Sequence, residues 1–276
     1  MQVTGPFDTE ILDVLPSTVK FICHNGVGYD NIDIATCTKK GIEVSNTPGE
    51  ANHATADLAI LLMLCALRRL WPALSAIREA DHPLGKWRGK TELGHNPQGK
   101  VLGILGMGGI GTEVARRAKA FGMSVIYHNR NKASPELEGA EYVTFESLLS
   151  RSDVISVHCP LTEDTIHIIG ESEFKKMKQG VVIINTARGA LVDEKALVAA
   201  LRNKKVAAAG LDVFENEPEI ESALREHPSV ILLPHVGTLT YETQENMERL
   251  TLDNLKSCLH TGDLLTKVPE QRNVTR

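Results

Sequence analysis

Several classes of protein are excluded by what the 276-residue sequence has little of. Phe, Trp and Tyr make up only 4% of the residues, too few for a platform that stacks single-stranded nucleic acid. Lys and Arg (30) are outnumbered by Asp and Glu (35), so the net charge of −5 offers no basic surface for a duplex. The longest apolar run, residues 58–67, is too short to span a bilayer. We therefore expect no nucleic-acid partner and no membrane association.

Cysteine is also scarce, and its spacing excludes two kinds of site. The five cysteines include no C-x-x-C pair and are widely separated, at positions 23, 37, 65, 159 and 258. An odd, scattered set indicates reduced thiols rather than a disulfide framework. The ten histidines show no metal-ligand spacing, and the first residues lack the basic and apolar regions of a secretory signal. We expect a cytoplasmic protein without a bound metal.

The residues that are present indicate a globular α/β protein of about two domains. From Lys100 onward, continuous apolar runs of strand length alternate with helix-like segments. Such runs predict a parallel sheet covered on both faces, in a doubly wound domain. The predicted strands are 101–105, 123–127, 140–143, 153–158, 181–185, 206–213 and 229–233, and the predicted helices between them are 109–121, 145–151, 172–178 and 193–203.

The remaining segments flank this pattern. Two short apolar runs, 19–23 and 42–44, are each followed by turn-rich sequence and predict a smaller α/β unit. Residues 54–69 predict a helix that is apolar nearly all round, which we expect to be buried on all sides, between domains or between subunits. Residues 71–100 lack periodicity and are interpreted as either a subunit interface or a surface loop. A long helix is predicted over 241–260.

The strongest local motif is a glycine-rich turn between a predicted strand and a predicted helix. Residues 106–111 read Gly-Met-Gly-Gly-Ile-Gly, a G-x-G-x-x-G pattern formed by Gly106, Gly108 and Gly111. The glycines permit a tight turn, close approach of a pyrophosphate and close helix–strand packing. The helix N-terminus offers N–H groups to the phosphates. We expect dinucleotide binding; the alternative is a turn selected for packing alone.

The end of the next strand bears on the choice of cofactor. Sites specific for NAD place an acid about twenty residues beyond the glycines, where it binds the ribose hydroxyls. This sequence has Asn129 there, followed by Arg130. An arginine would attract a 2′-phosphate that a carboxylate would repel. NADP(H) is therefore favoured; if Arg130 is only a solvated loop residue, NAD(H) is possible.

Three segments place chemically active residues just beyond predicted strands, where open α/β sheets bind ligands. They contain Arg188, Glu217 and His235. An arginine can hold a carboxylate with two hydrogen bonds, and a histidine can transfer a proton near neutral pH. A glutamate beside the ring would fix its tautomer. Each residue has a simpler interpretation as well: a surface charge for the arginine, one of several solvated acids for the glutamate, and a structural turn residue for the histidine.

Together with the glycine turn, these segments resemble the D-isomer-specific 2-hydroxyacid dehydrogenases, and most of all the fungal type of glyoxylate/hydroxypyruvate reductase. The resemblance extends from about Gly26 to Pro269 and rests also on residues 21–30, 127–130 and 185–189. It implies a Rossmann domain, a second flavodoxin-like substrate domain and reduction of small 2-keto acids such as glyoxylate and hydroxypyruvate.

The resemblance also implies roles for individual residues. Arg188 would bind the substrate carboxylate and keto oxygen, His235 would supply the proton as hydride arrives at carbon, and Glu217 would pair with His235. The backbone of Gly26, Val27 and Gly28 would hold the carboxylate. Cofactor contacts would come from the glycine turn and from residues at later strand ends, namely Gly106, Gly108, Gly109, Ile110, Gly111, Asn129, Arg130, Cys159, Pro160, Thr186, Ala187, Asp212 and Gly237. Cys159 has no base beside it in the sequence and is interpreted as a packing residue rather than a nucleophile.

The expected domain organisation follows from the same resemblance. Residues 1–52 and 238–276 would form the substrate domain, and residues 53–237 the dinucleotide-binding domain, with 53–100 as the dimerisation region of a homodimer. Family members ordinarily begin further upstream, so we expect the first part of the substrate domain to be missing. This leaves two alternatives to an active reductase: a non-catalytic dinucleotide-binding regulator, similar to corepressor relatives, or an inactive truncated form.

Overall fold

The computed structural model describes residues 5–78, 93–135 and 137–273. The chain divides into two compact units. Unit 1 comprises Met1–Ala51 and Thr238–Arg276, and unit 2 comprises Asn52–Gly237. Each unit has its own sheet and its own hydrophobic core. No helix in the described part of the chain is both long and apolar enough to span a bilayer.

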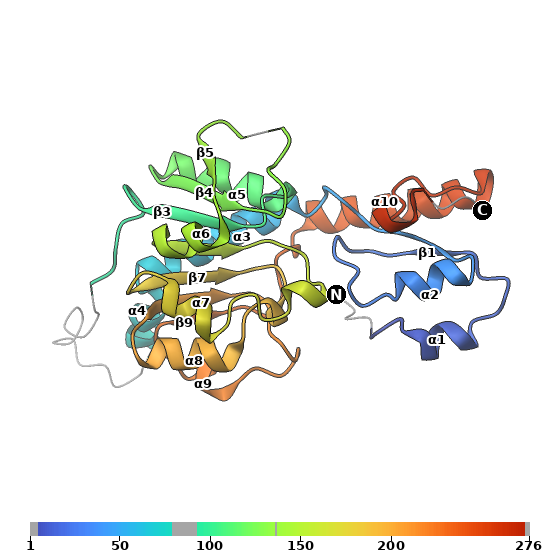
Figure 1. The fold of residues 1–276 in the computed structure, drawn as a ribbon. Helices are drawn as coiled ribbons and strands as arrows, with labels where there is room; N and C mark the ends of the chain where they lie inside the picture. Colours follow the sequence, from blue (N-terminus) through green and yellow to red (C-terminus); the bar gives the residue numbers. More distant parts are fainter. Residues whose placement is uncertain (1–4, 79–92, 136, 274–276) are drawn as a thin grey trace. The chain divides into compact units, whose positions relative to one another are not determined.

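Unit 2 is built on a parallel sheet of seven strands in the order β5-β4-β3-β6-β7-β8-β9 (Figure 1). The order runs outward in both directions from β3 and β6, which is the doubly wound arrangement. The predicted α/β fold class is therefore confirmed, and each predicted strand is present. The strands are β3 (Val101–Leu105), β4 (Ser124–His128), β5 (Ala140–Tyr142), β6 (Val154–Val157), β7 (Val181–Asn185), β8 (Val206–Leu211) and β9 (Val230–Leu232).

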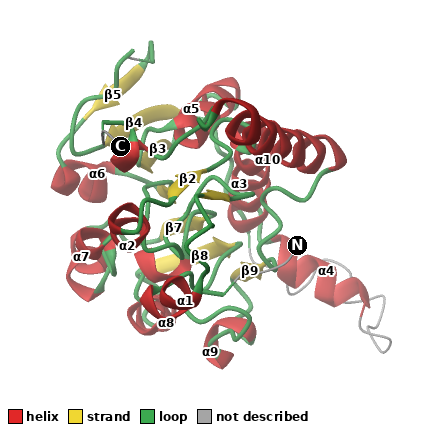
Figure 2. Ribbon diagram, turned by 90° about the vertical axis from the view of Figure 1, so that its right-hand side faces the viewer, coloured by secondary structure: helices red, strands yellow, loops and turns green. Residues whose placement is uncertain are grey.

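Helices cover both faces of this sheet (Figure 2). They are α3 (Asn52–Leu67), α4 (Leu70–Arg78), α5 (Gly109–Ala120), α6 (Phe145–Arg151), α7 (Glu171–Lys176), α8 (Glu194–Arg202) and α9 (Ser222–Arg225), with short 3-10 turns η2 (Glu163–Thr165) and η3 (Gly189–Leu191). Helices α3 and α5 pack on one face, and α6, α7 and α8 pack on the other. The four predicted helices between the strands are present, with ends that differ by at most two residues and with the predicted bounds for 145–151.

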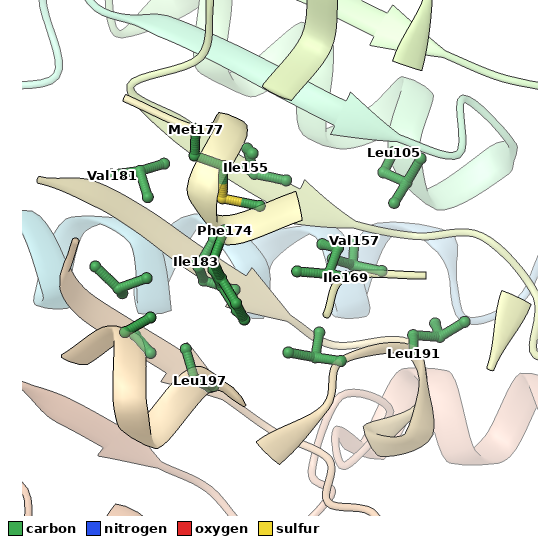
Figure 3. Close-up of a cluster of buried hydrophobic side chains, with 14 of the residues drawn as sticks. Leu105, Ile155, Val157, Ile169, Phe174, Met177, Val181, Ile183, Leu191 and Leu197 are labelled. Atoms are coloured by element: carbon green, nitrogen blue, oxygen red, sulfur yellow. The ribbon is translucent and has the colours of Figure 1, made fainter. Parts of the chain in front are cut away.

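The side chains of the strands alternate between the two cores. In β7, Val181 and Ile183 belong to the cluster drawn in Figure 3, while Val182 and Ile184 face α3 and α5. Both sets are buried, which explains why the strand reads as a continuous apolar run in the sequence. The two cores hold the strand ends, and so the loops that follow them, in fixed register.

One expectation for residues 54–100 is wrong in part. Residues 70–78 form helix α4 rather than irregular structure, because Pro72 falls in the first turn, where a helix tolerates proline. Most of helix α3 is buried within the chain, including Ala59 and Leu62, while Leu61 is 52% exposed, so burial of that side against a second subunit stays a prediction. Residues 79–92 of the expected dimerisation region lie outside the described residues.

Unit 1 contains α1 (Thr9–Val14), β1 (Phe21–Cys23), α2 (Ile34–Lys39), β2 (Glu43–Ser45), α10 (Tyr241–Thr261) and η4 (Pro269–Gln271). Strands β1 and β2 pair in parallel. The long predicted helix is confirmed and extends one residue beyond the predicted end, to Thr261; its C-cap Gly262 has a left-handed φ of 79°. The core of unit 1 is smaller than the cores of unit 2 and includes Leu12, Ile32, Cys37 and Val44.

Candidate active site

The candidate catalytic residues lie at one edge of the sheet in unit 2. Arg188 follows β7 and Asp212 follows β8, while His235 comes three residues after β9. These three strands are neighbours and parallel, so their carboxyl ends meet at the same edge. The topology therefore gathers residues that are almost fifty positions apart in the sequence.

The closest functional contact is between His235 and Glu217. His235 Nδ1 lies 2.8 Å from Glu217 Oε2, and Glu217 Oε1 accepts a hydrogen bond of 3.0 Å from the backbone N–H of Phe214. The carboxylate is thereby held by two partners and acts as the acceptor for Nδ1–H. This fixes the ring orientation and leaves Nε2 as the nitrogen available to a ligand.

The structure distinguishes Glu217 from its acidic neighbours. Glu215 and Glu194 exchange hydrogen bonds, each carboxylate accepting the other residue's backbone N–H at 2.7 and 2.9 Å. Glu219 is exposed. Of the three acids in this stretch, Glu217 is the one that contacts the histidine.

The pKa of the Glu217 carboxyl is lowered. Burial is the largest single influence and opposes ionisation, but the hydrogen bonds from His235 and from the Phe214 N–H, with the charges of His235 and Arg188, together outweigh it. The group is therefore a carboxylate at neutral pH.

Asp212 positions the turn that carries the histidine. It is buried, and its two carboxylate oxygens accept bonds of 2.8 Å from the N–H groups of Val236 and Gly237. Its backbone carbonyl accepts the His235 N–H at 2.8 Å, while His235 itself has a left-handed φ of 55°. Burial raises the pKa of Asp212, although the two N–H bonds oppose the rise. The aspartate thus stabilises an unfavourable backbone conformation at the histidine.

Arg188 is set on a loop that packs against the Glu217 segment. Asn185 holds the loop by donating Nδ2–H to the Arg188 carbonyl at 2.7 Å and by accepting the Ala187 N–H at 3.0 Å. A side chain at Gly189 would overlap the backbone of Phe214, so the two loops are in direct contact. Arginine and glutamate are consequently positioned by the same packing.

The glycine turn has the geometry of a phosphate cradle. Gly106 has φ 105°, and a Cβ there would overlap Cys159. The first bond of helix α5 runs from Thr112 N–H to the Gly108 carbonyl, which leaves the preceding N–H groups of the helix without an intrahelical acceptor. A Cβ at Gly108 would meet nothing within 4 Å. An anionic diphosphate therefore fits this turn.

A cavity of about 380 Å³ continues from the turn. Its walls include the predicted residues Asn129, Arg130, Cys159 and Pro160. The sequence did not indicate Asp164, which contributes a carboxylate to the same walls. The full lining is Leu105, Gly106, Met107, Gly108, His128, Asn129, Arg130, Asn131, His158, Cys159, Pro160, Thr162, Asp164, Thr165 and Ile168.

Polar atoms without partners give a second test of whether a cofactor fits unit 2. Among the described residues, His158 Nδ1 and Thr186 Oγ1 are buried and make no hydrogen bond. Such atoms are destabilising unless a ligand or water pairs with them. Both lie at strand ends on the edge that carries the glycine turn. The residues present therefore fit a bound dinucleotide.

In unit 1, the loop from Gly26 to Gly28 presents its N–H groups. The three carbonyl oxygens of the loop are all occupied: Gly26 accepts from the Thr47 N–H at 2.9 Å and Val27 from Asn46 Nδ2 at 2.8 Å, while Gly28 O lies 2.9 Å from His24 Nε2. No acceptor within the described residues is bonded to the loop N–H groups. They are available to an anionic group.

Comparison with known proteins decides the family. The family model described as D-isomer specific 2-hydroxyacid dehydrogenase, NAD binding domain, matches residues 60–237. The chain belongs to this family. The 4-methyl-2-oxopentanoate reductase A of Aspergillus oryzae is 62% identical, and the alignment covers 98% of this chain and 81% of that protein. Glyoxylate reductase 1 of Saccharomyces cerevisiae is 46% identical, with 98% and 78% covered.

Solved structures of the family agree. A glyoxylate reductase from Paecilomyes thermophila superposes with a TM-score of 0.92 at 61% identity, covering 98% of this chain and 81% of that one. An NADPH-dependent glyoxylate/hydroxypyruvate reductase from Sinorhizobium meliloti, solved with NADP and malonate, has a TM-score of 0.90 at 36% identity, covering 99% and 84%. The protein is thus a 2-hydroxyacid dehydrogenase that uses a nicotinamide dinucleotide.

Two of the predicted cofactor residues of this 2-hydroxyacid dehydrogenase, Cys159 and Asn129, have further structural features. Burial raises the pKa of the Cys159 thiol to about 11, which agrees with a packing role and not with a nucleophile. Asn129 does more than replace an acid, because its Oδ1 accepts the Met107 N–H at 2.6 Å and so fixes the glycine turn to the end of β4. No sequence pattern indicates this hydrogen bond.

In the described parts of the chain, no cluster of His, Cys, Asp or Glu could hold a metal ion.

Proposed function

We propose that the protein reduces small 2-keto acids, with glyoxylate and hydroxypyruvate as the preferred substrates and NADPH as the preferred reductant. The observation that carries the proposal is the His235–Glu217 pair, 2.8 Å apart at the carboxyl edge of the sheet. A histidine that is held by a carboxylate and exposes its second nitrogen is suited to deliver a proton to a keto oxygen.

The chemistry divides among the residues as follows. The bound nicotinamide supplies the hydride. His235 Nε2 donates its proton to the keto oxygen, and Glu217 stabilises the imidazolium before transfer. The Arg188 guanidinium holds the substrate carboxylate with two hydrogen bonds and polarises the keto oxygen. In unit 1, the N–H groups of Gly26–Gly28 are suited to bind a substrate carboxylate. The product is the 2-hydroxy acid.

The test is NADPH oxidation with glyoxylate for the wild type and for His235→Ala and Arg188→Ala. General acid catalysis contributes about 10²–10⁴-fold, so we expect kcat for His235→Ala to fall by about that factor. His260→Ala, at an exposed position of helix α10, is the matched control and should retain full activity. Unchanged turnover in both site variants would refute the assigned roles. Cofactor binding without turnover on any keto acid would instead favour the non-catalytic regulator.

The substrate side chain is a separate question, because the Aspergillus oryzae relative is named for a branched keto acid. Glyoxylate, hydroxypyruvate and 4-methyl-2-oxopentanoate should therefore be compared in one panel by kcat/KM. We expect the two small acids to be preferred. A higher kcat/KM for 4-methyl-2-oxopentanoate would refute that preference and leave the catalytic roles intact.

The preference for NADPH is supported by Arg130, which lines the cavity beyond the glycine turn with no acid at position 129. Arg130→Glu should weaken NADPH binding by tenfold or more and affect NADH much less, because only NADPH carries the 2′-phosphate. Asp164 lines the same cavity and opposes a phosphate, so Asp164→Asn should favour NADPH further. Equal affinities of the wild type for the two cofactors would refute the preference.

We also propose that the protein is a cytoplasmic homodimer. Free cysteines fit a reducing compartment. Leu61, Leu70, Trp71 and Leu74 are apolar side chains of α3 and α4 that are 38–52% exposed. Burial of such side chains against a second copy would be favourable. Light scattering should give twice the chain mass for the wild type and a lower mass for Leu61→Glu; a monomeric wild type would refute the dimer.

A further inference from the structure

The beginning of helix α3 lies directly against the phosphate turn. A Cβ built on Gly109 would meet the side chain of Asn52, with Cγ and Oδ1 both at 2.8 Å. Asn52 is the first residue of α3, and Gly109 is the first residue of α5. The amide of Asn52 is thus a neighbour of the N–H groups that the helix leaves without acceptors. No motif in the sequence relates these two positions.

The Asn52 amide has unused hydrogen-bonding capacity. Within the described residues its side chain makes no hydrogen bond, although the residue is only partly exposed. An asparagine amide has two donors and one acceptor, and a half-buried amide is more stable when a ligand or water pairs with them. The open space at Gly108, where a Cβ would meet no atom within 4 Å, is on the same turn.

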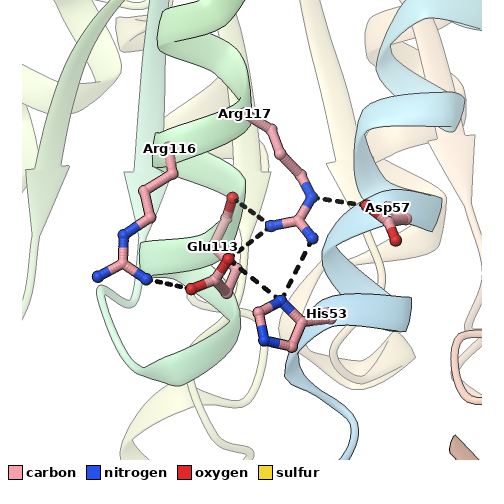
Figure 4. Close-up of polar contacts among 5 residues, drawn as sticks. All are labelled: His53, Asp57, Glu113, Arg116 and Arg117. Carbon is pink, nitrogen blue, oxygen red and sulfur yellow. Dashed lines mark hydrogen bonds and ion pairs between the residues drawn. The ribbon is translucent and has the colours of Figure 1, made fainter.

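A network of ion pairs holds the first two turns of α3 on α5 (Figure 4). Arg117 donates Nε–H to Asp57 at 2.6 Å and donates from its NH1 to Glu113 Oε2 at 2.7 Å. His53 Nδ1 lies 3.3 Å from Glu113 Oε2, and Arg116 also pairs with Glu113. These bonds follow the same order along both helices, so the helices run in the same direction and bring their N-termini together.

The charges in the network are well defined. Burial opposes ionisation of Glu113, but hydrogen bonds from Arg117 and Arg116 outweigh it and lower the pKa of the carboxyl. The Glu113 carboxylate is only 12% exposed and is bonded to both arginines. Its position is therefore more fixed than that of a carboxylate in a solvated surface ion pair. The residue that follows Asn52 takes part in this network, so the position of Asn52 is fixed before any ligand binds.

We propose that Asn52 is a cofactor-binding residue, whose Nδ2–H donates to the pyrophosphate of the dinucleotide. The proposal rests on dinucleotide binding by the family and not on the choice between NADH and NADPH or on the substrate. Two helix N-termini and one amide then face the diphosphate. Because the pyrophosphate is common to both cofactors, Asn52 contributes affinity without selecting between them.

The test measures equilibrium binding of NADPH, NADH and ADP-ribose by fluorescence and calorimetry, with no substrate present. A hydrogen bond to a charged group contributes enough that Asn52→Ala should raise the three dissociation constants about tenfold. Asn52→Asp should raise them further, because a carboxylate repels the phosphates. Asn52→Ser keeps a donor and should recover part of the affinity. Nicotinamide mononucleotide, which lacks the pyrophosphate, should bind all variants alike.

The matched control is Asn203→Asp. Asn203 ends α8 and precedes β8, at the opposite edge of the sheet, and its Oδ1 accepts the Lys205 N–H at 3.0 Å, which an aspartate can also do. This variant should bind all ligands like the wild type. Binding of ADP-ribose by Asn52→Asp within twofold of the wild type would overturn the proposal. Arg130→Glu, which should affect NADPH alone, separates this result from a failure of the cofactor preference.

Discussion

The sharpest prediction concerns the carboxylate beside the candidate proton donor. Glu217→Gln keeps the shape of the side chain and can still accept the Phe214 N–H, but it removes the negative charge next to His235. Because the pKa of Glu217 is lowered, the wild-type group is ionised throughout the neutral range. The substitution therefore changes the charge of the site at every pH at which the enzyme would be assayed.

The size of the expected effect follows from the hydrogen bond between His235 and Glu217. The pair is 2.8 Å apart, with the side chains of His235 and Glu217 30% and 24% exposed. A hydrogen bond between charged groups contributes about 1.5–3 kcal/mol, and this exposure places the pair near the lower end. At 1.36 kcal/mol per factor of ten in rate, the loss corresponds to about a tenfold lower rate of reduction.

The assay is kcat/KM for reduction of glyoxylate at neutral pH, where Glu217 is ionised. Reduction requires a proton donor that is oriented toward the keto oxygen, and the Glu217 carboxylate holds the ring of His235 through Nδ1. We expect kcat/KM of Glu217→Gln to be about tenfold lower than that of the wild type, because the charged acceptor for Nδ1–H is lost.

Glu219→Gln is the control, because it removes a charge from the same acidic stretch at an exposed position. Its kcat/KM should equal that of the wild type. A Glu217→Gln variant with kcat/KM within twofold of the wild type would show that the carboxylate does not support the histidine in the reaction.

Three further predictions concern stability and the turn that carries the histidine. Burial lowers the pKa of His158 to about 4, below the ordinary 6.5. The free energy of unfolding should therefore fall as pH decreases from 6.5 toward 4, by up to about 3 kcal/mol. Acid unfolding of His158→Gln, followed by circular dichroism, should lack this dependence. Ile183→Ala, at a fully buried position of β7, should cost about 2–5 kcal/mol in urea unfolding, and a loss below 1 kcal/mol would contradict the packing in Figure 3. Asp212→Asn should lose one of the bonds to Val236 and Gly237, lowering kcat more than it raises KM, and unchanged kinetics would refute its positioning role.

The fold of unit 2 was predictable because both faces of its sheet are buried. Burial on both faces requires apolar residues at successive positions, as in Val181–Ile184, and that run is visible without any structure. Helix α4 was not predicted, because residues 71–100 lack periodicity and contain a proline at position 72. The structure places Pro72 within the first turn, where its missing N–H has no carbonyl to bond in any case.

The candidate site was predictable to the extent that the topology of the sheet brings strand ends together. Arg188 follows β7 and His235 follows β9, two parallel strands of one sheet that are separated only by β8, and the family resemblance indicated the same residues. In the sequence Glu217 was one of several acids, and the family resemblance selected it. In the structure the choice depends on which carboxylate reaches the ring and which is already bonded to Glu194.

Asn52 was not predictable, because its position depends on how two helices pack rather than on where a strand ends. It precedes the glycine turn by more than fifty residues, and no periodicity connects them. The connection consists of Arg117, Glu113 and Asp57, side chains that in the sequence read as ordinary charges on helix surfaces. The order of these pairs shows that the two helices run in the same direction, and helix direction decides which end faces a ligand. A search for cofactor contacts in this family should therefore include the helices beside the glycine turn as well as the strand ends.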